Sequence, residues 1–268
     1  MPSTTQRSLA VVTGASSGIG HELAKQFAGN GFDVVIAAED AGITTAAADL
    51  EALGATVHPV RVDLAGYDGV EQLYAAVTAL GRPVDAVAIN AGVGVGGDFA
   101  RETDLRAELN LINLNVTSAV HLAKRLLPDM VSRGAGRVLF TSSIAATMPG
   151  PFEAVYAASK AFLLSFSEAI RNELKDTGVT VTALLPGPTE THFFHRAGMD
   201  DTRVGASTSK DDAAAVAAQG FKAMMSGDDS VVAASMSLKA QAVANKVLPE
   251  KVKAAAHRRL AEPRSGDS

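Results

Sequence analysis

The feature that most constrains the fold is a glycine-rich turn near the amino terminus, Thr13-Gly14-Ala15-Ser16-Ser17-Gly18-Ile19-Gly20. It joins a short apolar run, Leu9–Thr13, to the stretch Gly18–Gly29, whose apolar residues recur every four positions. Glycine permits positive φ and close backbone approach, and the free N–H groups that open a helix attract a pyrophosphate. This order of strand, glycine turn and helix predicts the first unit of a doubly wound sheet with a dinucleotide site.

The rest of the chain repeats this alternation of short apolar runs and amphipathic stretches, which is typical of βαβ units. We therefore predict an α/β fold: a doubly wound, Rossmann-like parallel sheet of about seven strands with helices on both faces, in three α/β/α layers. The expected strands are Leu9–Thr13, Asp33–Ala38, Thr56–Arg61, Asp85–Ile89, Gly136–Thr141, Val179–Leu184 and Ser230–Ala233. The expected helices are Gly18–Gly29, Ala41–Leu53, Val70–Leu80, Leu105–Val131, Val155–Thr177, Lys210–Met225 and Met236–Leu260.

The 268 residues fit a single domain over 1–268, with a substrate lid at about 188–210 and a C-terminal helical extension at about 236–262. A hydrophobic content of 47% with 20% charged residues argues against disorder. The net charge of −5 gives no overall basic footprint for nucleic acid. The chain has no cysteine, which excludes disulfides and thiolate sites, and Leu9–Val12 is too short for a signal peptide or a membrane span. We expect a cytoplasmic protein.

Two ionisable side chains, Tyr156 and Lys160, stand at i and i+4 on an expected helix and so share one face. An ammonium close to a phenol favours the phenolate and is expected to lower the pKa of the tyrosine towards the range of a general acid or base. Ser143 lies at the carboxyl end of an expected parallel strand, where ligands bind in such sheets. The neighbouring Ser142 competes for that position and is expected to support it.

The glycine spacing GxxxGxG, the segment Asn90-Ala91-Gly92 and the Tyr156/Lys160 pair together resemble the short-chain dehydrogenase/reductase family, along nearly the whole chain to about residue 190. The resemblance implies that Asn90, Ala91 and Gly92 line the adenosine side of the cofactor pocket. It also implies that Asp63, followed by Leu64, contacts the adenine amino group. Without the family, Asp63-Leu64 equally suits a helix-capping turn.

The resemblance also implies a catalytic tetrad of Asn115, Ser143, Tyr156 and Lys160, because Ser143 lies 13 residues before Tyr156. Asn110 and Asn113 compete with Asn115, which is preferred because Val116-Thr117-Ser118 follows it, as in the family. Tyr156 would exchange a proton with the substrate oxygen, Ser143 would hydrogen-bond that oxygen, and Asn115 would anchor a water. Tyr156 and Lys160 are also expected to contact the cofactor, Lys160 through the nicotinamide ribose. No metal is expected.

The cofactor implied is NAD(P)(H), and the sequence favours NAD. The family's NAD-type acidic position corresponds to Ala38 and its NADP-type arginine position to Glu39, so neither pattern is matched. A carboxylate at Glu39 would repel a 2′-phosphate, and Ser17 lacks the basic side chain that relatives using NADP often carry. In Pro186-Gly187-Pro188-Thr189-Glu190-Thr191, the resemblance implies a threonine that binds the nicotinamide carboxamide; Thr191 is preferred over Thr189.

The segment after Thr191 is expected to cover the substrate. Phe193 and Phe194 suggest one apolar wall, and Pro149, Phe152 and Val155 suggest the opposite one, which would suit a hydrophobic alcohol, a ketone or a 3-oxoacyl group. His192 and His195 lack a third clustered ligand, so they do not predict a metal site.

The stretch Met236–Leu260 carries six basic residues and one acid, a formal charge of +5. We read it as a solvated helix face, with a membrane surface or an acidic carrier protein as the less favoured partner. Its basic residues are Lys239, Lys246, Lys251, Lys253, Arg258 and Arg259. In relatives, the helices corresponding to Leu111–Val131 and Val155–Thr177 build homodimers or homotetramers, and the same assembly is expected here.

These expectations combine into an NAD(P)-dependent oxidoreductase that interconverts a secondary alcohol and a ketone, with a small carbonyl or alcohol as substrate. The alternative is a non-redox protein of the same fold, either a dinucleotide sensor or a hydrolase that reuses Ser143, Tyr156 and Lys160.

Overall fold

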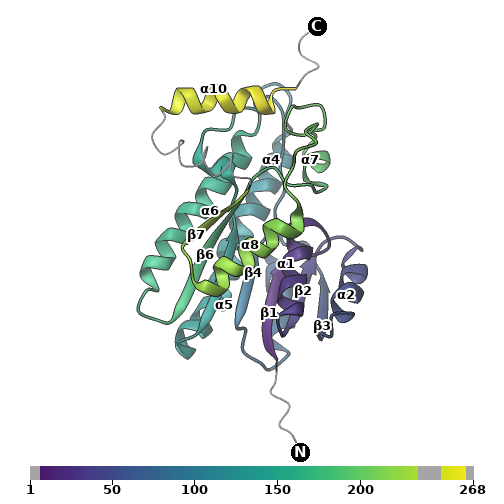
Figure 1. Cartoon of the computed structure of the whole chain (residues 1–268), viewed down its shortest axis with the longest axis vertical. Coiled ribbons are helices and arrows are strands. Elements are labelled where there is room, and N and C mark those ends of the chain that lie inside the picture. The colour runs from purple at the N-terminus through teal and green to yellow at the C-terminus, as the bar shows by residue number, and fades with distance from the viewer. Residues whose placement is uncertain (1–6, 235–248, 264–268) are drawn as a thin grey trace, which may run out of the picture.

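A computed structural model of the chain describes residues 7–234 and 249–263. Its centre is a seven-stranded sheet with the strand order β3-β2-β1-β4-β5-β6-β7, in which every neighbouring pair is parallel (Figure 1). The strands are β1 (Ser8–Thr13), β2 (Phe32–Ala38), β3 (Val57–Arg61), β4 (Ala86–Ile89), β5 (Gly136–Thr141), β6 (Val179–Pro186) and β7 (Ser230–Ala233). All seven expected strands are present, within two residues of their predicted ends.

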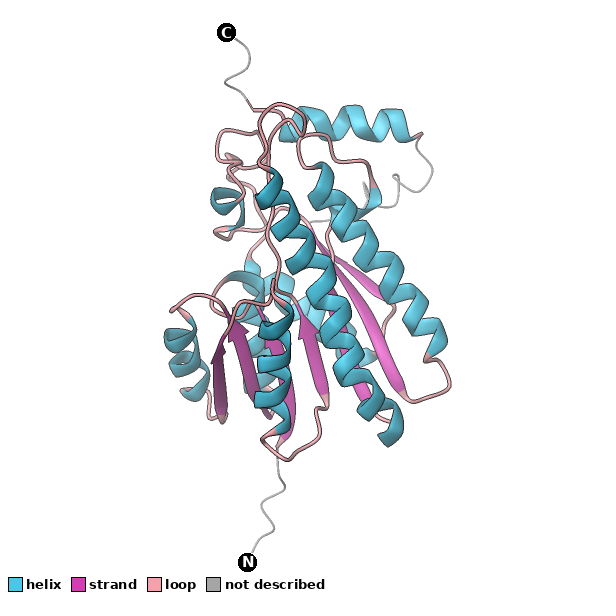
Figure 2. Cartoon of the chain, turned by 180° about the vertical axis from the view of Figure 1, so that it is seen from behind, coloured by secondary structure: helices cyan, strands magenta, loops and turns pink. Residues whose placement is uncertain are grey.

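Helices cover both faces of this sheet, and each face has its own apolar cluster (Figures 1 and 2). The first face carries α1 (Gly18–Gly29), α2 (Ile43–Glu51) and α8 (Ala213–Ser226). The second carries α3 (Tyr67–Thr78), α5 (Ser118–Arg133) and α6 (Ala154–Glu173). The predicted three-layer, Rossmann-like α/β/α fold is confirmed.

The central strands are largely apolar and buried because both faces of the sheet are covered. In β2 every residue is buried, and successive side chains alternate between the two clusters: Val34 and Ile36 pack on the first face, and Val35 and Ala37 on the second. A parallel sheet buried on both sides needs such continuous apolar runs. Because of this requirement, the strands could be located in the sequence as short apolar runs.

The chain changes direction in the sheet between β1 and β4. After β1 it builds outward to β2 and β3, and then returns to place β4 on the other side of β1. Such a switch point leaves a crevice beyond the carboxyl ends of the two central strands. The glycine turn after β1 and the segment Asn90-Ala91-Gly92 after β4 therefore meet there.

The prediction of one continuous helix over Leu105–Val131 is wrong. The structure divides it into α4 (Leu105–Ile112), a turn of π-helix, η1 (Asn113–Thr117), and α5. The wider turn of a π-helix admits one extra residue, and such turns are frequent at functional sites. Here the turn contains Asn115, whose side chain is buried.

The C-terminal part adds two helices beyond the edge of the sheet where the strands end. A short helix, α7 (Phe193–Arg196), lies in the segment 188–210 that was predicted to be a lid, and α10 (Glu250–Ala261) lies across the top in Figure 1. The backbone N–H of Val204 donates to the carbonyl of Leu260 at 3.1 Å, so α10 is attached to the segment that follows α7. None of the helices in the described ranges has the length and apolar character needed to cross a membrane.

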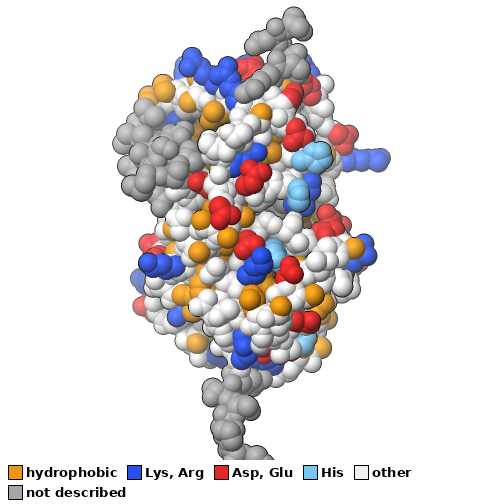
Figure 3. Space-filling model, turned by 45° about the vertical axis from the view of Figure 1, so that its right-hand side comes forward, with side chains coloured by type: hydrophobic (Ala, Val, Ile, Leu, Met, Phe, Trp, Pro, Cys, Tyr) orange, Lys and Arg blue, Asp and Glu red, His pale blue; other side chains and the backbone are white. Residues whose placement is uncertain are grey.

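Part of the predicted helix Met236–Leu260 lies outside the described residues, including Lys239 and Lys246. Within α10, two of the basic side chains have local partners. Lys253 is buried and contacts Glu250, and Arg258 donates to Glu262 at 2.6 Å. Charged side chains of both signs are mixed over the face shown in Figure 3.

Candidate active site

The glycine turn after β1 opens into a long pocket that continues past β4 and β5 to α6, α7 and α10. Gly14 and Gly18 have positive φ of 66° and 58°, which side chains rarely adopt. Ser17, the N-cap residue of α1, makes no side-chain hydrogen bond to the helix. The first amide groups of α1 are therefore available to an anion, and this end of the pocket fits a dinucleotide pyrophosphate.

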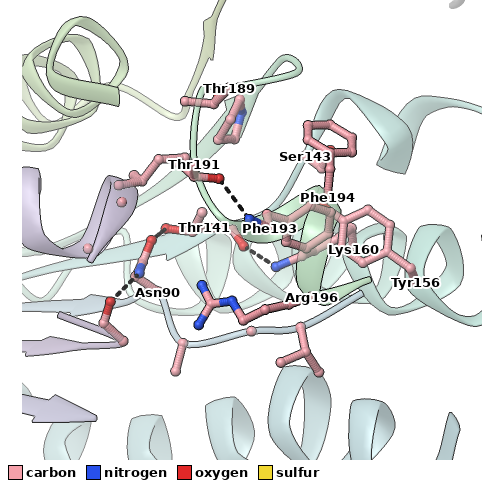
Figure 4. A pocket seen from close by; sticks show the side chains of 18 of the residues that line it. Asn90, Thr141, Ser143, Tyr156, Lys160, Thr189, Thr191, Phe193, Phe194 and Arg196 are labelled. Carbon is pink, nitrogen blue, oxygen red and sulfur yellow. Dashed lines mark hydrogen bonds between the residues drawn. The ribbon is translucent and has the colours of Figure 1, made fainter. Parts of the chain in front are cut away.

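Asn90 joins the ends of three neighbouring strands. Its side-chain Nδ2 donates to the carbonyl of Thr13 at 3.1 Å, and its Oδ1 accepts from Oγ1 of Thr141 at 3.0 Å (Figure 4). Its backbone N–H donates to Oγ1 of Thr13 at 2.9 Å. The predicted Asn90 thus shapes the floor of the pocket through its hydrogen bonds to β1 and β5.

Carboxylates gather at the end of the pocket beyond β2 and β3. Glu39 and Asp63 line it as predicted. Asp63 also accepts from the N–H of Ala65 at 2.8 Å within a local turn, but it does not cap α3, whose N-cap residue is Gly66. Asp40, which the sequence reasoning missed, accepts from Oγ of Ser16 at 2.7 Å. This hydrogen bond lowers the pKa of Asp40, and the charge of Arg196 lowers it further.

Tyr156 and Lys160 lie together in the middle of the pocket, on the first turns of α6 (Figure 4). Nζ of Lys160 lies 5.7 Å from the centre of the Tyr156 ring and donates to the carbonyl of Thr141 at 2.9 Å. Lys160 is buried, and burial lowers its pKa to about 8. Lys160 therefore loses its proton more readily than an exposed lysine, and a charged group that enters the pocket would change its pKa.

The pKa of Tyr156 differs in direction from the expectation. Burial raises it, the negative charge of Glu153 raises it further, and a hydrogen bond with Ser143 lowers it only in part. We predicted that Lys160 would lower this pKa, but in this structure the cost of charging a buried phenol outweighs any such effect. The phenol is therefore held in its protonated form.

The two candidate serines have different surroundings. Ser142 donates from Oγ to the carbonyl of Lys160 at 2.7 Å, which fits the supporting role predicted for it. Ser143 is the N-cap residue of a short 3-10 helix, η2 (Ile144–Thr147), and its Oγ accepts from the N–H of Ala145 at 3.1 Å. Both line the pocket, and Ser143 is the one that meets Tyr156.

Asn115 lies behind the pocket wall. Its Oδ1 accepts from the N–H of Val93 and its Nδ2 donates to the carbonyl of the same residue, both at 2.9 Å. Nδ2 also donates to Oγ of Ser159 at 3.0 Å. Asn115 thereby attaches the loop after β4 to the helix of Lys160, whereas Asn110 and Asn113 are exposed.

Thr191 and Thr189 also differ. A Cβ added to Gly18 would lie 3.1 Å from Cγ2 of Thr191, so Thr191 packs directly over the glycine turn. Thr189 is buried and donates to the carbonyl of Gly187 at 2.9 Å within its own turn. Thr191 is the better placed of the two to contact a bound cofactor.

Apolar side chains surround the remaining end of the pocket. The ring of Phe193 lies 5.1 Å from that of Tyr156, and Phe194 also lines the pocket, as predicted. The opposite wall was predicted incorrectly, because Pro149, Phe152 and Val155 are not among the lining residues. The apolar lining residues there are Ile144, Ala145, Met148, Val204 and Leu260.

The two histidines of the lid are exposed, and His195 contacts Asp200 at 2.7 Å. In the described ranges, no group of three or more histidine, aspartate or glutamate side chains is arranged to hold a metal ion.

The pocket brings together all the predicted cofactor residues, and of the predicted tetrad Asn115 alone lies outside its lining. Among the lining residues that sequence reasoning missed, Asp40 was accessible, since it lies 20 residues after Gly20. Glu153, Arg196, His257 and Leu260 carried no local signal, because long-range packing brings them to the site.

Comparisons with known proteins agree with this geometry. A family model described as short chain dehydrogenase matches residues 8–202. A short chain dehydrogenase of Pseudocercospora fijiensis is 36% identical over 190 residues, which are 70% of this chain and 62% of that protein.

Two solved structures are also similar. A short-chain dehydrogenase from Sphingobium yanoikuyae in complex with NADPH has a TM-score of 0.80 and 26% identity, with 89% of this chain and 93% of that chain covered. A short-chain dehydrogenase/reductase from Burkholderia phymatum in complex with NAD has a TM-score of 0.79 and 25% identity, with 89% and 92% covered.

Two glycines of α1 provide a matched test of the turn. A Cβ at Gly20 would lie 2.1 Å from the carbonyl oxygen of Gly14 and 2.5 Å from Nδ2 of Asn90, whereas a Cβ at Gly29 meets nothing within 4 Å. We expect Gly20→Ala to lower the free energy of unfolding by about 2 kcal/mol or more, measured by urea denaturation, and to weaken NAD(H) binding at least tenfold by calorimetry. Gly29→Ala should leave both unchanged or slightly improved. Equal behaviour of the two variants would contradict this account of the turn.

Proposed function

This chain belongs to the short-chain dehydrogenase/reductase family, and we propose that it is an NAD(P)-dependent oxidoreductase that interconverts a secondary alcohol and a ketone. The observation that carries the proposal is the pairing of Tyr156 and Lys160 in a pocket that begins at the glycine turn. The pocket thus offers a dinucleotide site and a proton-transfer site that are continuous with each other.

In the direction of ketone reduction, Tyr156 donates its phenolic proton to the carbonyl oxygen as the carbonyl carbon receives a hydride. A nicotinamide cofactor held in this pocket would supply that hydride, or would accept it in the reverse direction. Ser143, which contacts Tyr156, donates a hydrogen bond to the same substrate oxygen and orients it. The protonated phenol favoured by burial is the form that this direction requires.

Lys160 and Asn115 support the reacting groups. Lys160 would hydrogen-bond the nicotinamide ribose of a bound cofactor, and its positive charge would stabilise negative charge that develops on Tyr156. Asn115 holds the loop after β4 and Ser159 in place through its three hydrogen bonds, and so fixes the wall beside Lys160. The pyrophosphate binds at the first turn of α1.

Removal of the phenolic hydroxyl tests the reaction. With NAD(H) and NADP(H) and a panel of ketones and secondary alcohols, Tyr156→Phe should lower kcat about 10²- to 10⁴-fold, the usual contribution of positioned acid-base catalysis. Tyr67→Phe is the matched control, because Tyr67 is 66% exposed and lies outside the pocket. Full turnover by Tyr156→Phe would overturn the assignment, and tight cofactor binding without turnover by the wild type would indicate a sensor.

NAD is the preferred cofactor in this proposal. The carboxylates of Glu39 and Asp40 line the adenosine end, where a 2′-phosphate would meet their negative charge. Arg196 also lies at this end, but its positive charge interacts with the carboxylate of Asp40 and lowers the pKa of that group. The known structures of similar proteins contain NADPH in one case and NAD in the other, so they support either cofactor.

We expect the wild type to bind NAD at least tenfold more tightly than NADP, measured by calorimetry. Glu39→Arg should reduce this ratio at least tenfold, because it replaces a repelling charge by an attracting one. The control Glu51→Arg makes the same change of charge at an exposed position outside the pocket. A ratio that responds equally to both variants would attribute the preference to net charge alone.

We also propose that residues 1–268 form one domain whose segment 188–210 is a lid, since Thr191 packs on the glycine turn and Phe193 on Tyr156. Removal of lid contacts would then affect cofactor and substrate binding together.

The chain is further proposed to form a homodimer or homotetramer through the predicted helices Leu111–Val131 and Val155–Thr177, which correspond to the end of α4 with η1 and α5, and to α6. An apolar groove lies between the end of α4, η1 and α6, and its exposed side chains include Phe99, Ile112 and Phe162 at 61%, 38% and 41% exposure. Light scattering should give two or four times the chain mass of 27.5 kDa. Phe162→Glu should lower that mass, whereas Leu53→Glu, at a comparably exposed residue after α2, should not. A monomeric wild type would refute the assembly.

A further inference from the structure

A buried carboxylate lies at the substrate end of the pocket. Glu153 immediately precedes α6, three residues before Tyr156, and its side chain is 7% exposed. Its Oε2 lies 3.1 Å from Nε2 of His257, which α10 contributes and whose side chain is 9% exposed. Both residues line the pocket. The mechanism described above uses neither of them.

The second carboxylate oxygen of Glu153 is available to a molecule in the pocket. Within residues 7–234 and 249–263, no hydrogen-bond donor contacts Oε1. Oε1 therefore keeps its capacity to accept a hydrogen bond. The oxygen belongs to a side chain that lines the pocket, so a molecule in the pocket can supply the missing donor.

Apart from His257 and Tyr156, much of the lining at this end of the pocket is apolar. Ile144, Met148, Phe193 and Leu260 line the same end of the pocket and offer no side-chain hydrogen bond of the usual N–H or O–H type. The positively charged side chains of the lining interact elsewhere. Lys160 donates a hydrogen bond to the carbonyl of Thr141 at the end of β5, and the charge of Arg196 lowers the pKa of Asp40. A carboxylate in such an environment attracts a donor and repels an anion.

Glu153 is also close to the reacting atoms. It is the N-cap residue of α6, three residues before Tyr156, and both side chains line the same pocket. Its negative charge acts on the phenol of Tyr156. A substrate whose carbonyl meets Tyr156 can therefore reach Glu153 with a group only a few bonds away.

We propose that Glu153 is a specificity-determining residue: it accepts a hydrogen bond from a hydroxyl or ammonium group of the substrate, a few bonds from the ketone. His257 is a positioning residue that holds the carboxylate in place. The substrate class is then a ketone or alcohol with a second, hydrogen-bond-donating group, and not a keto acid. This inference rests on the proposed function, because it assigns a substrate class to the same site.

A matched series of ketones tests the proposal. Cyclohexanones carry a hydroxyl, ammonium, methyl or carboxylate group on the carbon opposite the carbonyl, and short open-chain methyl ketones of increasing length carry the same terminal groups. We expect kcat/KM to be about 10- to 100-fold higher for the better donor-bearing ketone than for its methyl analogue, the usual contribution of a hydrogen bond to a charged group. The carboxylates should be the poorest substrates.

The variants locate the preference. Glu153→Leu should remove the preference for both donors, and Glu153→Gln should remove the preference for ammonium more than that for hydroxyl, because glutamine keeps an acceptor without the charge. Glu168→Gln is the control, since Glu168 lies exposed on the same helix. A wild type that treats hydroxyl, ammonium and methyl ketones alike, or a preference that survives Glu153→Leu, would overturn the proposal.

Binding separates this inference from the proposed reaction. Calorimetry on Tyr156→Phe, with cofactor added, measures the same ketones without turnover, and the preference should again disappear when Glu153→Leu is combined with it. A binding preference without any wild-type turnover would refute the oxidoreductase and leave the subsite intact. Turnover without a preference would do the opposite.

Discussion

The hydrogen bonds of Asn90 are the interaction on which the rest of the site depends. They link the ends of β1, β4 and β5. The backbone carbonyl of Thr141, at the end of β5, in turn accepts a hydrogen bond from the ammonium of Lys160. The glycine turn, the floor of the pocket and the buried lysine are therefore parts of one connected arrangement. Parallel strands place their carboxyl ends at one edge, but only such side-chain links fix the loops that follow them.

Most of the fold could be predicted because a sheet that is covered on both faces requires apolar strands that are easily recognised in the sequence. The continuous apolar runs, the glycine turn and the i, i+4 spacing of Tyr156 and Lys160 are local features, and local features can be recognised from the sequence alone. The π-helical turn at Asn115 could not be seen in this way. One extra residue in a helix leaves apolar periodicity on both sides nearly unchanged, and the inward turn of Asn115 depends on its partner Val93.

The parts of the site that could not be predicted depend on distance or on burial. Glu153 and His257 are 104 residues apart and meet only because α10 packs over the lid. The pKa of Tyr156 was predicted in the wrong direction because the sequence shows which charges are near but not how much water is excluded. In the folded chain, burial favours the uncharged forms of both Tyr156 and Lys160.

The separate origin of the two sides of the pocket has an evolutionary consequence. Tyr156 and Lys160 belong to a helix that packs on the sheet, and most changes to that packing would also disturb the core. His257 and Leu260 belong to α10, which is attached through the lid and does not build the sheet. New side chains on α10 can therefore reshape what the pocket accepts while the reaction chemistry is inherited unchanged, so descendants of this chain can diversify in substrate without first sacrificing stability.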